Sequence, residues 1–103
     1  MPSSFLRVLK ISDVPPGTKK AADVDGKSIL ICHTGGNFYA VSNICSHANE
    51  KLECGRLGKS WISCPLHGAR FELATGRAMN PPAVRPIAKF EVRLVEDWIE
   101  VQV

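Results

Sequence analysis

Four potential metal ligands fall in two short segments of this 103-residue chain. The segment "CSH" holds Cys45 and His47, and the segment "CPLH" holds Cys64 and His67, with sixteen residues between the two pairs. Thiolate and imidazole groups bind zinc and iron, and the proline and glycine around the second pair favour a tight turn. The two segments therefore predict two loops that hold one inorganic centre between them.

Zinc is the first alternative for this centre, because two thiolates and two imidazoles make a tetrahedral structural site. Zinc fingers, however, usually pair Cys with Cys and His with His along the chain. Here each loop supplies one Cys and one His. A [2Fe–2S] cluster of the Rieske kind needs that mixture, since two Cys hold one iron and two His hold the other. The pairing favours the cluster, and a zinc-stapled interaction module remains the alternative.

The pattern from Cys45 to Gly68 resembles the Rieske domain, and the small format resembles the Rieske-type ferredoxins of bacterial aromatic-ring dioxygenase systems. The resemblance extends to "GARFELATGRA" after the second loop and to the proline-rich "NPPAVRP" before a closing hairpin. It implies one [2Fe–2S] cluster held by Cys45, His47, Cys64 and His67. It also implies that the cluster lies near the surface, where Leu66, Pro81 and Pro82 form an apolar docking patch or shield the cluster from water.

Four positions depart from the high-potential Rieske proteins of respiratory complexes, which carry a loop disulfide and two hydroxyl groups near the cluster. Glu50 and Leu66 stand where the resemblance would place the disulfide cysteines, Ala69 replaces a Ser, and Phe71 replaces a Tyr. Hydrogen bonds to the cluster sulfurs stabilise the reduced, more negative state, so their loss lowers the potential. We expect a potential near the lower end of the Rieske range of about −150 to +300 mV.

The rest of the chain predicts an all-β fold: a small antiparallel sandwich or barrel with a cluster-binding subdomain formed by two loops at about 43–69. Apolar and polar residues alternate in short runs between turn signals such as "PPG", "DG" and "GGN". One domain over residues 1–103 is expected. The predicted strands are Phe5–Ile11, Lys19–Val24, Lys27–Thr34, Phe38–Ser42, Ser60–Ser63, Arg70–Leu73, Ile87–Val95 and Trp98–Val103.

The side chains expected in the core come mainly from the C-terminal hairpin, whose two strands alternate apolar and polar residues. They are Phe90, Val92, Leu94, Ile99, Val101 and Val103, together with Trp61 and Trp98. Gly68 and Gly76 are expected to meet the backbone geometry of a loop and a turn.

Two further cysteines and one histidine lie outside the ligand pattern. Cys32, in the apolar run "SILIC", is expected to be a buried thiol. His33 is expected at the surface or in a hydrogen bond, because it faces the other side of the same strand. Cys54 is expected to be a free thiol under the first loop.

The charge distribution and the absence of long apolar or signal-like runs argue against several classes of function. The net charge of +3 comes from thirteen basic and ten acidic residues that are mixed along the chain, which argues against nucleic-acid binding. The chain shows no membrane span and no secretory signal, and we expect a cytoplasmic monomer.

With the resemblance, these features predict an electron carrier that is not itself an enzyme. It would pass single electrons from a flavoprotein ferredoxin reductase fed by NAD(P)H to the terminal Rieske oxygenase of an aromatic dioxygenase system. The alternative is the small Rieske-like subunit of an assimilatory nitrite reductase, although several such subunits lack the ligands that this chain has in full.

Overall fold

The computed structural model describes residues 4–46, 50–65, 68–80 and 85–103. These residues form short strands and two 3-10 turns, and none of their helices is long and apolar enough to cross a bilayer. The elements are β1 (Phe5–Lys10), η1 (Ile11–Asp13), β2 (Thr18–Val24), β3 (Lys27–Thr34), β4 (Asn37–Ser42), η2 (Leu52–Cys54), β5 (Trp61–Ser63), β6 (Arg70–Glu72), β7 (Lys89–Val95) and β8 (Trp98–Gln102).

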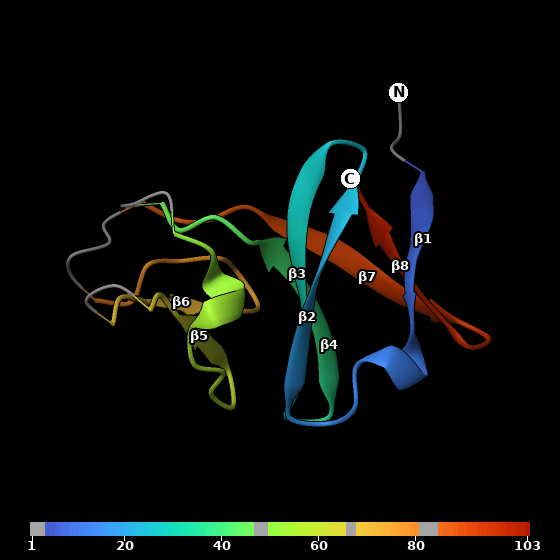
Figure 1. Ribbon diagram of the computed structural model, residues 1–103, viewed down its shortest axis with the longest axis horizontal. Coiled ribbons are helices and arrows are strands. Elements are labelled where there is room, and N and C mark those ends of the chain that lie inside the picture. The colour runs from blue at the N-terminus through green and yellow to red at the C-terminus, as the bar shows by residue number, and fades with distance from the viewer. Residues whose placement is uncertain (1–3, 47–49, 66–67, 81–84) are drawn as a thin grey trace.

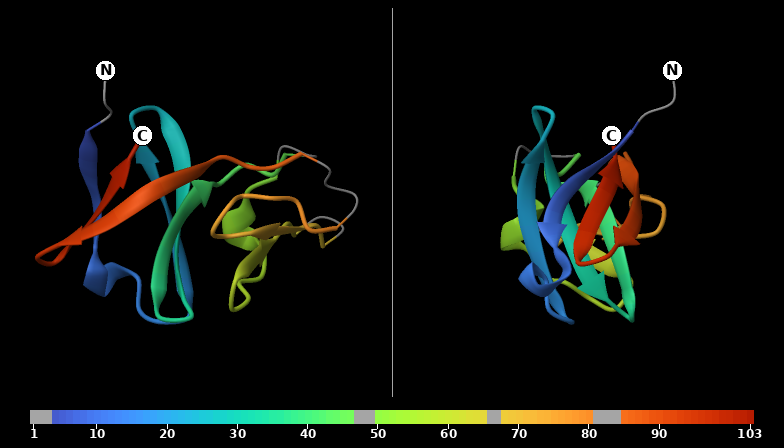
Figure 2. Two further views of the ribbon diagram at one scale, coloured as in Figure 1. Left: turned by 180° about the vertical axis from the view of Figure 1, so that it is seen from behind. Right: turned by 90° about the vertical axis from the view of Figure 1, so that its right-hand side faces the viewer.

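The larger sheet holds six antiparallel strands in the order β1-β8-β7-β4-β3-β2. Its edge strands β1 and β2 contact each other, so the sheet curves into a nearly closed barrel (Figure 1, Figure 2). The turn between β2 and β3 places Asp25 and Gly26 at positive φ, 55° and 81°, as a two-residue hairpin requires. The predicted all-β class is confirmed, and each observed strand lies within two residues of its predicted bounds.

The second sheet pairs β5 with β6 and lies beside the barrel, at the left of Figure 1 together with η2. Single bridges extend it on both edges, from Leu57 to Ile62 and from Phe71 to Ala78. Each bridge adds a neighbouring segment to the pair, so four short segments lie side by side. This small sheet carries the second predicted ligand loop at one end.

Strand β3 is the wall between two cores. Ile29 and Ile31 are fully buried inside the barrel, whereas Leu30 and Cys32 are fully buried on the side of the small sheet. The alternation follows from the pleat of a strand, and burial on both faces explains the continuous apolar run "SILIC". The second of these cores also contains Cys45 and Cys64, so the barrel provides the floor of the candidate metal centre.

The prediction that Leu94 is a core residue is wrong, since it is 49% exposed. Strand β7 pairs with β4 only at Lys89 and Phe90, and its distal half has β8 alone as a neighbour. Leu94 lies in that distal half, close to the β7–β8 turn. Its partner Ile99 is fully buried because β8 also pairs with β1.

Both tryptophans are half-buried, so their assignment to the core is also wrong. The centre of the Trp98 ring lies 5.2 Å from the Arg7 guanidinium carbon and 5.6 Å from Lys10 Nζ. Trp61 lies on the outward side of the small sheet under Arg70. The alternation of apolar and polar residues could not predict this partial burial. A large aromatic ring can pack against the aliphatic stems of long basic residues at the surface instead of entering the core.

Candidate metal centre

The two predicted ligand loops are closed by the same backbone hydrogen bond. Cys45 N donates to Glu50 O at 2.9 Å, and Cys64 N donates to Ala69 O at 2.6 Å, so each Cys is joined to the residue five positions later. Behind each bond the chain continues as a two-stranded ribbon, through the Ile44–Lys51 bridge in one case and β5–β6 in the other. Each of the two cysteines therefore lies where a ribbon ends and a predicted ligand loop begins.

The two cysteines belong to one buried cluster. Cys45 is 3% exposed and Cys64 is 1% exposed, and both lie in the same apolar core as Leu52 and Phe71. Two soft sulfur donors at the bases of paired loops, above an apolar floor, fit an iron–sulfur centre that needs shielding from water. The other predicted residues of the site, His47, His67, Leu66, Pro81 and Pro82, lie outside the described residues.

Asn43 fastens the first loop to the barrel, and this role was not predicted. Its side chain is fully buried, and its Nδ2 donates to Ser28 Oγ at 3.1 Å and to Glu53 Oε1 at 2.8 Å. Its Oδ1 accepts from Glu53 N at 2.9 Å. A buried amide with its polar atoms paired is costly to replace, so Asn43 fixes the chain two residues before Cys45. A single Asn directly after the apolar run "FYAVS" was the only available signal.

Gly55 allows the backbone just before the second loop to pack closely against the chain that follows η2. A Cβ atom at this position would lie 1.7 Å from Ser63 O, which is far closer than atoms can approach. Ser63 directly precedes Cys64, and its N donates to Arg56 O at 2.9 Å. The backbone after the 3-10 turn and the backbone of β5 can therefore touch only because residue 55 has no side chain.

The segment that contains Pro81 and Pro82 is tied to both loops through described residues at its two ends. Ser46 Oγ in the first loop donates to Arg85 O at 2.6 Å. Asn80 Oδ1 accepts from Arg70 N at 2.7 Å, and its Nδ2 donates to Gly68 O over a longer 3.5 Å. Ser46 and Asn80 thus hold the ends of this third segment against the first and second loops. Neither residue was predicted, because each partner is a distant backbone group.

Ala69 and Phe71 are fully buried in the core that contains both cysteines. By the family resemblance, these are the positions where the high-potential proteins carry hydroxyl groups. Here both side chains are apolar, so neither gives a hydroxyl donor to this core. The two glycines predicted for backbone geometry, Gly68 and Gly76, have φ of 67° and 81°, which confirms that prediction.

The remaining thiols and the third histidine have structural surroundings. Cys32 is fully buried, and this burial raises the pKa of its thiol to about 12, against a smaller opposing effect of Lys19. The thiol is therefore protonated and unreactive at neutral pH, as a buried structural Cys should be. His33 is hydrogen-bonded as predicted: its Nδ1 donates to Val14 O at 2.7 Å. Cys54 is a free thiol, but it is exposed on η2 and does not lie under the loop.

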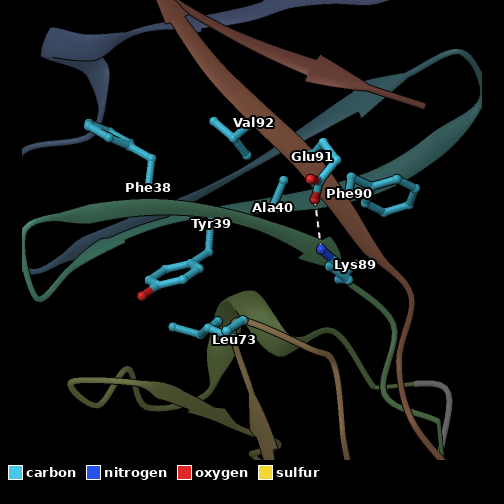
Figure 3. A pocket seen from close by; sticks show the side chains of 9 residues that line it. Phe38, Tyr39, Ala40, Leu73, Lys89, Phe90, Glu91 and Val92 are labelled. Atoms are coloured by element: carbon cyan, nitrogen blue, oxygen red, sulfur yellow. Dashed lines mark hydrogen bonds and ion pairs between the residues drawn. The ribbon is translucent and has the colours of Figure 1, made fainter. Parts of the chain in front are cut away.

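A groove of about 230 Å³ lies where the barrel meets the small sheet (Figure 3). Tyr39 and Leu73 approach it from opposite sides, and Lys89 and Glu91 form an ion pair of 2.7 Å at its edge. Ligand pockets are usually larger and more enclosed, with several converging polar groups. This groove marks the seam between the two sheets, and none of its lining residues is a predicted ligand.

Comparison with known proteins decides what kind of centre this is. Residues 4–91 match the family model of the Rieske [2Fe-2S] domain. The chain belongs to the Rieske [2Fe–2S] family. An iron–sulfur cluster is therefore the cofactor of this fold, and the zinc alternative is set aside.

Among its relatives are ferredoxins of dioxygenase systems. The ferredoxin component of biphenyl 2,3-dioxygenase from Rhodococcus jostii is 34% identical over 95% of this chain and 92% of that protein. The ferredoxin of carbazole 1,9a-dioxygenase from Nocardioides aromaticivorans superposes with a TM-score of 0.91, at 36% identity over 97% of this chain and 98% of that chain. A carbazole 1,9a-dioxygenase ferredoxin solved in complex with its oxygenase gives 0.88, at 32% identity over 95% and 92%. These relatives are electron-transfer components of dioxygenase systems and not the catalytic subunits.

The Rieske fold also occurs in proteins with other roles. A solved chain described as a nitrite reductase NADPH small subunit superposes with a TM-score of 0.83, but at 15% identity. That likeness shows the fold alone. The sequence relatives at 30% identity or above therefore favour the ferredoxin over the nitrite reductase subunit.

Proposed function

We propose that this protein is the ferredoxin of an aromatic-ring dioxygenase system, taking single electrons from a flavoprotein reductase and delivering them to a terminal Rieske oxygenase. The observation that carries the proposal is the full-length match to dioxygenase ferredoxins, one of which is solved with its oxygenase. A carrier fed by NAD(P)H works in the cytoplasm, where reducing conditions also keep an exposed thiol such as Cys54 free. We expect it to act as a monomer, because a shuttle must exchange partners.

We propose Cys45, His47, Cys64 and His67 as the ligands. The burial of both cysteines in one core, at the bases of two loops with the same closing bond, supports this assignment. When bound, the cluster supplies a one-electron couple. The chain's own contribution is to hold the ligand loops rigidly on the barrel through Asn43 and Gly55, and to keep an apolar floor beneath them. Leu66, Pro81 and Pro82 are proposed as the docking patch beside the ligand histidines.

The test of the proposal is metal and spectroscopic analysis of the aerobically purified protein. We expect two irons and two acid-labile sulfides per chain, visible absorption, and a Rieske-type EPR signal after reduction with dithionite. Replacing Cys64 with Ala should abolish the signal, whereas replacing Cys54 with Ala should preserve it. A colourless protein, or one that contains zinc, would refute the ligand assignment.

The two side chains that hold the third segment should control how long the cluster survives. Each hydrogen bond of Ser46 and Asn80 is worth about 1 kcal/mol, so Ser46→Ala or Asn80→Ala should accelerate loss of the visible absorbance in a chelator by about fivefold. Thr75→Ala is the matched control, because Thr75 Oγ1 makes a comparable bond of 2.6 Å to Glu72 on the surface. Equal rates in all three variants would show that these bonds do not protect the site.

A further inference from the structure

The small sheet has an outward face that the proposed electron transfer does not use. Ile62 and Phe71 point into the core and are fully buried, so Trp61, Arg70 and Glu72, which lie next to them along the two strands, face outward. The bridges at Leu57 and Ala78 place Arg56 and Met79 in line with the same outward positions. Together the outward side chains cover four neighbouring segments.

We call this surface the arginine face and define it by Arg56, Trp61, Arg70, Arg77 and Met79. The Arg70 guanidinium carbon lies 4.2 Å from the centre of the Trp61 ring. The same ring lies across Gly58, where a Cβ atom would be 2.1 Å from the indole. Because Gly58 has no side chain, the indole can lie against the backbone while the arginine stacks on it. Met79 is 44% exposed, so an apolar side chain lies next to the charged residues of the face.

The arginine face carries a net charge of +2, because its three arginines are accompanied by one carboxylate, that of Glu72. All three of its arginines are exposed, and the one acidic residue among them is Glu72. The Glu72 carboxylate already accepts from Thr75 Oγ1 at 2.6 Å and lies 3.6 Å from Arg77 Nη2. The rest of the chain holds ten of the thirteen basic residues and nine of the ten acidic ones, so most of the net charge of +3 resides here.

The face is continuous with the second ligand loop. Ser63 of β5 directly precedes Cys64, and Arg70 directly follows Ala69, which closes the loop. A protein that approaches the tip of this loop therefore meets the arginine face beside it. Arg, Trp and Met are residue types enriched at protein interfaces, and charged rims steer the encounter of redox partners.

We propose that the arginine face docks against an acidic surface of the terminal oxygenase. This inference rests on the proposed function, because it assumes that the chain delivers electrons to such an oxygenase. The positive charge selects an acidic counterpart, and the Trp61–Arg70 stack gives an apolar and geometrically fixed centre for the contact. Because Arg70 directly follows the residue that closes the second loop, the face lies beside that loop and can orient a partner that docks there.

The test compares two triple variants with the same change in net charge. One reverses the face, R56E/R70E/R77E, and the other reverses exposed lysines of the barrel strands, K10E/K20E/K27E. Iron content and EPR spectra are measured first, and binding to the immobilised oxygenase of the same system follows at low and high salt. We expect the face variant to bind about tenfold more weakly than the wild type and to lose salt dependence, while the control changes much less.

Several results would overturn the inference. The first is that both triple variants bind the oxygenase equally weakly, and the second is that the face variant binds it as tightly as the wild type does. The third is that the face variant binds only the flavin reductase more weakly. Binding of a DNA duplex by the wild type that the face variant abolishes, with oxygenase binding intact, would assign the face to nucleic acid instead. Should charge reversal prevent folding, R56Q/R70Q/R77Q serves as the second variant, with an expected loss of about fivefold. A wild type without iron and sulfide would refute the proposed function itself, whatever the arginine face does.

Discussion

Gly55→Ala is expected to destabilise the protein by about 3 kcal/mol or more and to reduce its cluster content sharply. The new Cβ would lie 1.7 Å from Ser63 O. The positions of both atoms are fixed by the backbone, because a Cβ cannot rotate and Ser63 O is a main-chain oxygen. No side-chain rotation relieves such a clash, so β5 must move away from η2. That movement shifts Cys64, the residue after Ser63, relative to Cys45. Thermal unfolding should show a midpoint lower by on the order of 15 °C, and iron analysis should show partial loading.

The matched control for this prediction is Gly26→Ala in the β2–β3 turn. Gly26 has φ of 81°, and a Cβ atom added there would have no other heavy atom within 4 Å, so alanine is penalised by backbone conformation alone. We expect a loss of about 1 kcal/mol with full iron content. Similar iron content in both variants would contradict the conclusion that the contact between Gly55 and Ser63 positions the second loop.

The double variant Ala69→Ser with Phe71→Tyr is expected to raise the reduction potential substantially. The two side chains lie fully buried in the core of Cys45 and Cys64, so hydroxyl groups introduced there would add hydrogen-bond donors to the surroundings of the proposed sulfur ligands. Each bond made preferentially to the reduced state is worth about 1 kcal/mol, which corresponds to about 40 mV for a one-electron couple. Protein-film voltammetry should therefore show an increase of about 80 mV.

Phe38→Tyr is the control for the potential measurement. Phe38 stacks on His33 at 3.9 Å and packs against the barrel core, away from the two cysteines. Its added hydroxyl should leave the potential unchanged. No upward shift in the double variant would show that the apolar residues at 69 and 71 do not keep the potential low.

Much of this fold could be predicted because local patterns decide it. The strands follow from two-residue periodicity, and turn residues such as Asp25 and Gly26 are required by backbone geometry that only a few residue types adopt easily. Leu94 and the two tryptophans were misassigned for a different reason. Alternation tells which residues share a face, but burial depends on which other strand covers that face.

The sequence by itself indicated the cofactor family, because the proposed ligands Cys45, His47, Cys64 and His67 mix donor types within each loop, and the match to the Rieske family model decided against zinc. The tertiary structure alone revealed what holds those loops in place. Asn43, Ser46 and Asn80 bond to groups far away in the chain, and Gly55 matters only because another backbone crosses it. The arginine face belongs to the same class: its members come from four segments, and only their pairing in one small sheet makes them neighbours. Ligand chemistry resides in residue types and short spacing, whereas anchoring and surface charge depend on contacts between distant residues, which one-dimensional patterns do not encode.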